Sequence, residues 1–352
     1  MRDVVEDVER WAAAGQSVAL GTVVGVRRSA PRPPGAKMAI SSGGEVSGQV
    51  SGGCVEGAVV EAAQEVLAGG APRLMQFGIT DDEAWEVGLP CGGEIDVWVS
   101  GTPHPGFAAL ARAGGRGALV TRLDNEGTLF VPVDGAAQGS LGSEELDAAG
   151  CAAAAELAWA GQSERRELEG VTVFVDTTAP PPRVIAFGAV DIAGSLCRIA
   201  QALGWRSYVV DPRGFFARPD RFAAADEVVA GWPREAFAQI GGIDRATSIV
   251  VLTHDPKLDD AALAIALRSE AEYVGAMGSR RAQAARRERL HGLGLTDAEL
   301  ERLAAPVGLD LGALTPEETA VSVMAEIVAV RRGREGGRLK HATGRIHEVE
   351  AS

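Results

Sequence analysis

Two cysteines in glycine-rich turns are the residues best suited to chemistry in this sequence. Cys54 follows a Gly-Gly pair, and Cys91, 37 residues later, precedes another. Apolar residues recur at helical spacing from Val55 to Leu67, so we expect Cys54 where the turn becomes the first turn of a helix. Free N–H groups and the positive end of the helix dipole favour an anion there, and such a position favours the thiolate form of a cysteine. A small packing residue in a tight bend is the alternative interpretation.

A basic loop lies upstream of this turn. The stretch RRSAPRPPGAK, residues 27–37, contains three prolines and four basic residues. The formal net charge of the chain is −14, so an anionic ligand would need a local positive site. We predict that Arg27, Arg28 and Lys37 contribute to such a site, and a solvated loop is the alternative.

Composition and charge exclude several classes of protein. The 352 residues are 46% hydrophobic and 23% charged, which is typical of a globular chain of two domains. The acidic balance argues against non-specific binding to nucleic acid or to an anionic membrane surface. No signal peptide or membrane-spanning run is evident, so we expect a cytoplasmic protein with four free thiols. We expect no metal site, because the histidines are scattered and no C-x-x-C pair exists. A homodimer is the default assembly.

The pattern of predicted elements divides the chain at a proline-rich linker, residues 179–183. We expect an α/β protein whose N-terminal domain, residues 1–178, is mixed α/β and contains a degenerate internal repeat. The first unit covers residues 1–100. The worn copy, residues 101–178, repeats the order strand, strand, Gly-Ser turn, helix, strand but lacks the Ser-Gly-Gly-Cys sequence, and Cys151 lies there among alanines.

Residues 184–330 predict a C-terminal Rossmann-like domain with a doubly wound parallel sheet, followed by a basic and polar tail, residues 331–352. A helix is expected over Ser195–Leu203. The glycine fingerprint of dinucleotide sites is damaged, because Val190 replaces its second glycine and Asp191 adds negative charge at the helix start. The pattern therefore supports the fold but gives little support to NAD(P) binding.

Ligands of such sheets bind beyond the carboxyl ends of the strands. Ser279 and Arg280 start a helix, and we predict that they form a phosphate cradle. Arg286, Arg287 and Arg289 are expected on the solvated face of that helix. Thr315 and Glu318 predict a capping box. The candidate ligand-binding residues of this edge are Gly188, Asp211, Arg213, His254, Asp255, Gly278, Ser279 and Arg280.

Six ordered motifs cover nearly the whole chain. They are VSGGCVEGAV (50–59), GLPCGGEIDV (88–97), VVDPRGFFARPDRF (209–222), VVLTHDPKLDDAAL (250–263), YVGAMGSRRAQAARRERL (273–290) and PVGLDLGALTPEETAVSVMAEI (306–327). With these motifs the chain resembles the XdhC/CoxI family, the maturation factors of molybdenum hydroxylases such as xanthine dehydrogenase.

The resemblance implies a chaperone that binds the molybdenum cofactor, a molybdopterin with a dithiolene and a terminal phosphate. It would hold the cofactor during sulfuration, with sulfur from a cysteine desulfurase, and deliver it to an apo molybdenum hydroxylase. Cys54 and then Cys91 are the candidates for sulfur or metal contact, and Ser51, Gly52 and Gly53 would clear space for the pterin. Two alternatives stay open: an NAD(P)-dependent oxidoreductase and a non-catalytic scaffold.

Overall fold

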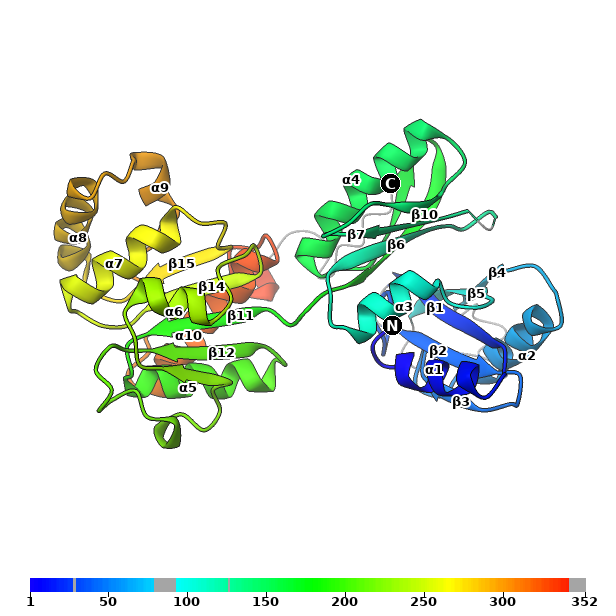
Figure 1. Cartoon of the computed structure of the whole chain (residues 1–352), viewed down its shortest axis with the longest axis horizontal. Coiled ribbons are helices and arrows are strands. Elements are labelled where there is room, and N and C mark those ends of the chain that lie inside the picture. The colour runs from blue at the N-terminus through cyan, green and yellow to red at the C-terminus, as the bar shows by residue number, and fades with distance from the viewer. Residues whose placement is uncertain (28–29, 79–92, 126, 342–352) are drawn as a thin grey trace. The chain divides into compact units, whose positions relative to one another are not determined.

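The computed structural model describes residues 1–27, 30–78, 93–125 and 127–341. It contains two compact units, Met1–Pro180 and Pro181–Ala342 (Figure 1). Each is described separately below.

The first unit contains two antiparallel sheets of five strands with matching topology. The strand orders are β3-β2-β1-β5-β4 and β8-β7-β6-β10-β9, so each strand of the first sheet has a counterpart five strands later. The first half comprises α1 (Val5–Ala13), β1 (Val18–Arg27), β2 (Lys37–Ser41), β3 (Val46–Gly48), α2 (Glu56–Leu67), β4 (Arg73–Phe77) and β5 (Glu94–Ser100). The second half comprises α3 (Pro105–Arg112), β6 (Gly117–Arg122), β7 (Thr128–Pro132), β8 (Gln138–Ser140), α4 (Glu144–Ala160), β9 (Glu164–Leu168) and β10 (Val171–Thr178).

Alternating side chains give each sheet two buried faces. In β1, Ala19 and Val23 pack with α2, whereas Val24 points the other way and packs with Trp98 and Phe174. Residues of α4 pack in the same manner on the outer face of the second sheet. Because Phe174 belongs to β10, the inner faces of the two sheets pack on each other, with α2 and α4 outside.

The second unit is a parallel sheet of six strands in the order β13-β12-β11-β14-β15-β16. The order reverses direction between β11 and β14, and this is where ligand crevices form in doubly wound sheets. Helices α5 and α10 cover one face, and α6 and α7 the other. The elements are β11 (Arg183–Phe187), α5 (Asp191–Ala202), β12 (Arg206–Val210), η1 (Pro219–Arg221), β13 (Glu227–Val229), α6 (Pro233–Gln239), β14 (Thr247–Val251), α7 (Pro256–Leu267), β15 (Tyr273–Ala276), α8 (Arg280–Gly292), α9 (Asp297–Glu301), β16 (Leu303–Ala304), α10 (Pro316–Arg331) and η2 (Leu339–His341).

The predicted fold class is confirmed, although several short elements were not predicted, namely β3, β8, β9, α3 and α9. Helix α5 begins at Asp191 and not at Ser195, because the turn before it closes tightly through a hydrogen bond from Val190 N to Gly188 O of 2.9 Å. The short strand β16 was not predicted. The capping box of Thr315 and Glu318 is present as expected. Among the helices of the described residues, none has the length and apolarity to cross a membrane.

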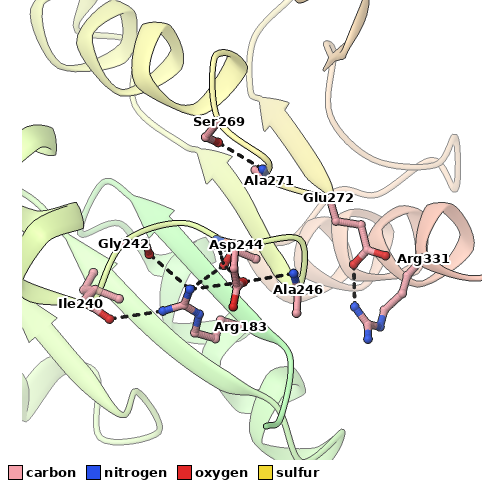
Figure 2. A network of polar contacts seen from close by, with 10 residues as sticks. Arg183, Ile240, Gly242, Asp244, Ala246, Ser269, Ala271, Glu272 and Arg331 are labelled. Carbon is pink, nitrogen blue, oxygen red and sulfur yellow. Dashed lines mark hydrogen bonds and ion pairs between the residues drawn. The ribbon is translucent and has the colours of Figure 1, made fainter. Parts of the chain in front are cut away.

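Arg183 fixes the start of the second unit (Figure 2). Its guanidinium donates to the carbonyl oxygens of Ile240 and Gly242, both at 3.2 Å, and to Thr247 Oγ1 at 2.8 Å. It also pairs with Asp244 at 3.3 Å. One side chain therefore joins the first strand of the sheet to the loop that precedes β14, at the edge opposite the predicted ligand crevice.

We predict that Arg183→Ala lowers the free energy of unfolding of the second unit by about 2 kcal/mol, because several acceptors lose a charged donor. Urea titration monitored by tryptophan fluorescence measures this loss. Arg218→Ala is the control, because Arg218 pairs with Asp220 in an exposed position and its loss should change little. Equal stability of the two variants would contradict the anchoring role.

Candidate functional site

The Cys54 turn is organised by the carboxylate of Glu56. Glu56 Oε1 accepts a hydrogen bond from Ser51 N at 2.8 Å. Glu56 Oε2 accepts from Ser51 Oγ at 2.6 Å, Gly53 N at 2.9 Å and Val55 N at 3.2 Å. The donors that we expected to attract an external anion therefore bind an anion that the chain itself supplies.

This arrangement changes the prediction for Cys54. Helix α2 begins at Glu56 with Val55 as its N-cap, so the cysteine precedes the helix and does not lie in its first turn. Cys54 N donates to Ser51 Oγ at 3.2 Å, and the residue is exposed. Although partial burial opposes the charge of Glu56, hydrogen bonds from Ser51 and Gly53 hold the pKa of its carboxyl below the ordinary value.

The turn is longer than its counterpart in the second half. Residues 51–55 separate buried Val50 from α2, but only residues 142–143 separate buried Leu141 from α4. The shorter turn is closed by Asp147 Oδ1, which accepts from Leu141 N at 2.5 Å. The added length holds Gly53, whose φ is +116°, and a Cβ placed there would have no heavy atom within 4 Å. The first turn therefore presents Cys54 beside open space.

The predicted basic loop is neutralised by acidic residues that are distant in sequence. Arg27 pairs with Glu94 at 2.7 Å and with Asp96 at 3.1 Å. Lys37 is buried and pairs with Asp176 at 2.6 Å. The pairing does not support the prediction that Arg27 and Lys37 bind an anion. Two further candidates, Arg28 and Cys91, lie outside the described residues.

At the carboxyl edge of the second unit, Gly188 serves packing. Its φ is +115°, and a Cβ there would clash with Thr253 Cγ2. Asp211 is fully buried and accepts from Ala189 N at 3.0 Å and from Arg213 Nε and Nη2 at 2.9 and 2.7 Å. Although burial opposes ionisation, these hydrogen bonds hold the pKa of Asp211 below its ordinary value.

This geometry disfavours a dinucleotide. In Rossmann enzymes the acid after the second strand binds a ribose, but both oxygens of Asp211 already have donors. The start of α5 carries Asp191, whose side chain is 84% exposed and lies 3.7 Å from Arg221. A pyrophosphate there would meet a carboxylate, so the geometry does not support NAD(P) binding.

The turn from β15 to α8 has the donor set that a phosphate requires. Ser279 caps α8 by accepting from Ala282 N at 3.2 Å, and Arg280 is exposed. Gln283 Oε1 accepts from Arg286, and Gln283 Nε2 is a buried donor without a partner among the residues that the structure describes. A Cβ on Gly278 would lie 3.1 Å from that nitrogen, so the glycine keeps the approach open. Sequence reasoning missed Gln283, since a glutamine in a polar helix carries no signal of burial.

Arg286 corrects another expectation. It is buried and does not lie on the solvated helix face, since it pairs with buried Asp259 at 3.1 Å and donates to Met277 O at 3.0 Å. Asp259 also accepts from Thr253. Burial raises the pKa of Asp259 above its usual range, although Thr253 and Arg286 oppose this shift. The contacts of Arg286 with Asp259 and with Met277 O hold the turn before α8 in place.

The remaining candidates of this edge lie near the end of β14. Asp255 caps α7 by accepting from Lys257 N at 3.0 Å, and its charge helps to raise the pKa of Arg213, for which hydrogen bonding to Asp211 is the main cause. The structure thus pairs Asp211 with Arg213 and leaves Asp255 within electrostatic range of that arginine. His254 is exposed next to them.

Comparison with known proteins gives two family matches in separate parts of the chain. Residues 11–78 match the XdhC and CoxI family, and residues 184–327 match the XdhC Rossmann domain. The chain belongs to the XdhC and CoxI family.

Two relatives and one solved structure are similar over most of this chain. The molybdenum cofactor insertion chaperone PaoD of Escherichia coli is 29% identical over 323 residues, 92% of this chain and 86% of that protein. A probable xanthine dehydrogenase subunit of Bacillus subtilis is 26% identical over 326 residues, 90% of this chain and 94% of that protein. A crystal structure described as a xanthine dehydrogenase of Bacillus halodurans has 25% identity, a TM-score of 0.64 and coverage of 94% and 96% of the two chains.

The Glu56 carboxylate generates a prediction for pH dependence. The pKa of Glu56 is lower in the folded protein than in the unfolded chain, where it is about 4.3, so the ionised carboxylate stabilises the fold. This stabilisation is fully present at pH values above about 4.3 and is lost as the pH falls through the pKa of the folded state. We expect Glu56→Gln to cost about 1 kcal/mol at pH 7, allowing for solvent screening of a half-buried group, and much less at pH 3.

Urea unfolding at both pH values measures this difference. Glu61→Gln, on the exposed side of the same helix, is the matched control and should show no such pH dependence. A Glu56→Gln cost that is the same at pH 7 and pH 3 would mean that the carboxylate charge does not hold the turn.

Proposed function

We propose that this chain binds the molybdenum cofactor and delivers it to an apo molybdenum hydroxylase, working in the cytoplasm as a carrier. The observation that carries the proposal is the asymmetry of the duplicated first unit. The extended turn with an exposed cysteine is present in the first half, and a short capped turn replaces it in the second. The names of the two relatives, a molybdenum cofactor insertion chaperone and a probable xanthine dehydrogenase component, support the same cofactor and the same class of client.

The chemistry of the Cys54 turn fits the metal end of this cofactor. Bound cofactor supplies a molybdenum centre held by dithiolene sulfurs, and thiolates are suitable partners for soft metal and sulfur centres. Gly52 and Gly53 add no side chains around the thiol, and Glu56 keeps the backbone of the turn in place. Cys54 would contact the metal or hold sulfur during sulfuration, with a cysteine desulfurase as the sulfur source.

The turn from β15 to α8, in the second unit, is a separate candidate site for a phosphate group. Gln283 Nε2, the exposed Arg280 guanidinium and the N-terminus of α8 are all donors, and an anion is the ligand that satisfies such a set. The buried pair of Arg286 and Asp259 holds this turn without presenting a free charge to the ligand. Arg280 and Gln283 would bind a phosphate group at this turn, and Gly278 would let it approach.

Replacing Cys54 tests the metal end. We expect Cys54→Ser to reduce activation of the partner hydroxylase roughly tenfold or more, because a serine hydroxyl cannot replace sulfur as a ligand of a soft metal or as a carrier of sulfur. The readout is hydroxylase activity after maturation with purified variant. Cys151→Ser, a change in the half-exposed cysteine of the second half, is the control and should support full activation. Cys91→Ser tests the second candidate. Full activation by both the Cys54 and Cys91 variants would rule out the sulfur role.

The phosphate end generates a separate prediction. We expect the double variant Arg280→Gln and Gln283→Met to retain several-fold less cofactor, because two donors to the phosphate are lost. Pterin fluorescence after acid oxidation of purified protein measures retention. Arg287→Gln is the matched control on the same helix, since Arg287 pairs with Asp297 and Glu301 on the outer face. Equal loss in both proteins would show that helix charge in general, and not this turn, holds the ligand.

A further inference from the structure

A cavity of about 440 Å³ lies between the two sheets of the first unit, apart from the Cys54 turn. Both halves of the duplication contribute to it, through inward-facing residues of β1, β2 and β5 on one side and β6, β7 and β10 on the other. Its walls are apolar and partly aromatic, with Trp98, Phe107, Leu119 and Phe174 among them. The volume and lining are typical of a site for a small organic molecule.

A buried ion pair forms the charged part of the side-chain wall, beside hydroxyl groups such as those of Thr22 and Thr121. Lys37 Nζ lies 2.6 Å from Asp176 Oδ2, and the two side chains are 3% and 7% exposed. Lys37 also donates to Thr22 Oγ1 at 3.3 Å, and Asp176 Oδ1 accepts a long bond of 3.4 Å from Ser163 Oγ. An acceptor and a donor therefore stand side by side at a cavity wall and keep unused hydrogen-bonding capacity. Apolar residues of similar volume would stabilise such an interior at least as well, so this pair suggests recognition.

The charge balance limits the ligand. Among the residues described in this wall, Lys37 is the only lysine or arginine, and Asp176 neutralises it. Met1 also lines the cavity, and burial lowers the pKa of its amino group to about 6, which favours the neutral amine at pH 7. His104 also lines the cavity, and burial lowers the pKa of its imidazole, which favours the neutral form. A phosphate or another anion would find no unpaired lysine or arginine side chain in the described part of the wall. The cavity suits a flat, neutral molecule with adjacent donor and acceptor groups.

We infer that this cavity binds the neutral ring of a 2-amino-4-oxopteridine or a 2-amino-6-oxopurine. The Asp176 carboxylate accepts from the ring's N–H and amino donors, the Lys37 ammonium donates to the ring carbonyl, and the aromatic walls contact the ring faces. The preference for the pteridine over the purine rests on the proposed function, because the pterin of the cofactor carries this edge.

Binding of isolated heterocycles to the full chain tests the inference. Pterin should bind at least tenfold more tightly than lumazine, which replaces the 2-amino group with a carbonyl and leaves the carboxylate facing an acceptor. Pterin should also bind more tightly than 9-methylguanine, which presents the same edge on a purine. Equilibrium dialysis with fluorescence detection measures pterin and lumazine, and displacement of pterin measures 9-methylguanine.

Two variants test whether the ligand binds in the cavity. Thr121 lines it from a half-buried position, so Thr121→Phe fills the space without touching the ion pair and should weaken pterin binding tenfold or more. Thr172→Phe, on β10 of the same sheet and outside the cavity wall, is the control and should bind like wild type. The double variant Lys37→Met and Asp176→Leu removes both charges together and should abolish the preference for pterin over lumazine.

Two results would overturn the inference: equal binding of pterin and lumazine, or wild-type binding of pterin by Thr121→Phe. Tighter binding of 9-methylguanine than of pterin would overturn the preference for the pteridine over the purine. The proposed function fails differently, through wild-type protein that retains no cofactor after purification from a cofactor-producing host. A wild-type protein that retains cofactor, together with a Thr121→Phe variant that retains as much, would reject the cavity and leave the carrier function standing.

Discussion

The first unit depends on the pairing of Lys37 with Asp176 between its two sheets. Two antiparallel sheets can pack face to face only if their inner residues leave no uncompensated charge, and this pair lies in that interior. Removing one partner alone would leave a buried charge, which costs about 3–5 kcal/mol. Since Lys37 belongs to the first half and Asp176 to the second, the contact also requires both halves of the duplication to be folded before either inner face is satisfied.

Duplication explains how chemistry can be confined to one half. Each copy buries its outer face under its own helix and its inner face against the other copy, so the scaffold needs no further contribution from the turns before α2 and α4. Leu141 and Asp147 close the second turn by simple capping. In the first turn Glu56 performs the closure through the backbone N–H groups of Gly53 and Val55, and the side chain of Cys54 stays exposed.

The sequence predicted what depends on local pattern. Apolar periodicity and turn residues were sufficient for the duplicated first unit and for the doubly wound sheet, including the capping box at Thr315. It did not predict contacts between distant residues. The sequence predicts Lys37 to belong to a basic loop, because its partner Asp176 lies in another sheet and is distant in sequence. It predicts Arg286 to be solvated, because its partner Asp259 lies on another helix. Charge patterns along a chain do not show which charges meet in space.

The second unit shows why a Rossmann-like sheet need not bind a dinucleotide. Its two usual contacts are both altered by charge: Asp191 occupies the helix start where a pyrophosphate would bind, and the oxygens of Asp211 are held by Arg213 and by Ala189 N. The parallel sheet still brings the ends of several strands to one edge, so ligand contact can move to another turn. The turn after β15 meets that requirement, because Gln283 Nε2 is a buried donor that gains a partner only when an acceptor enters from outside.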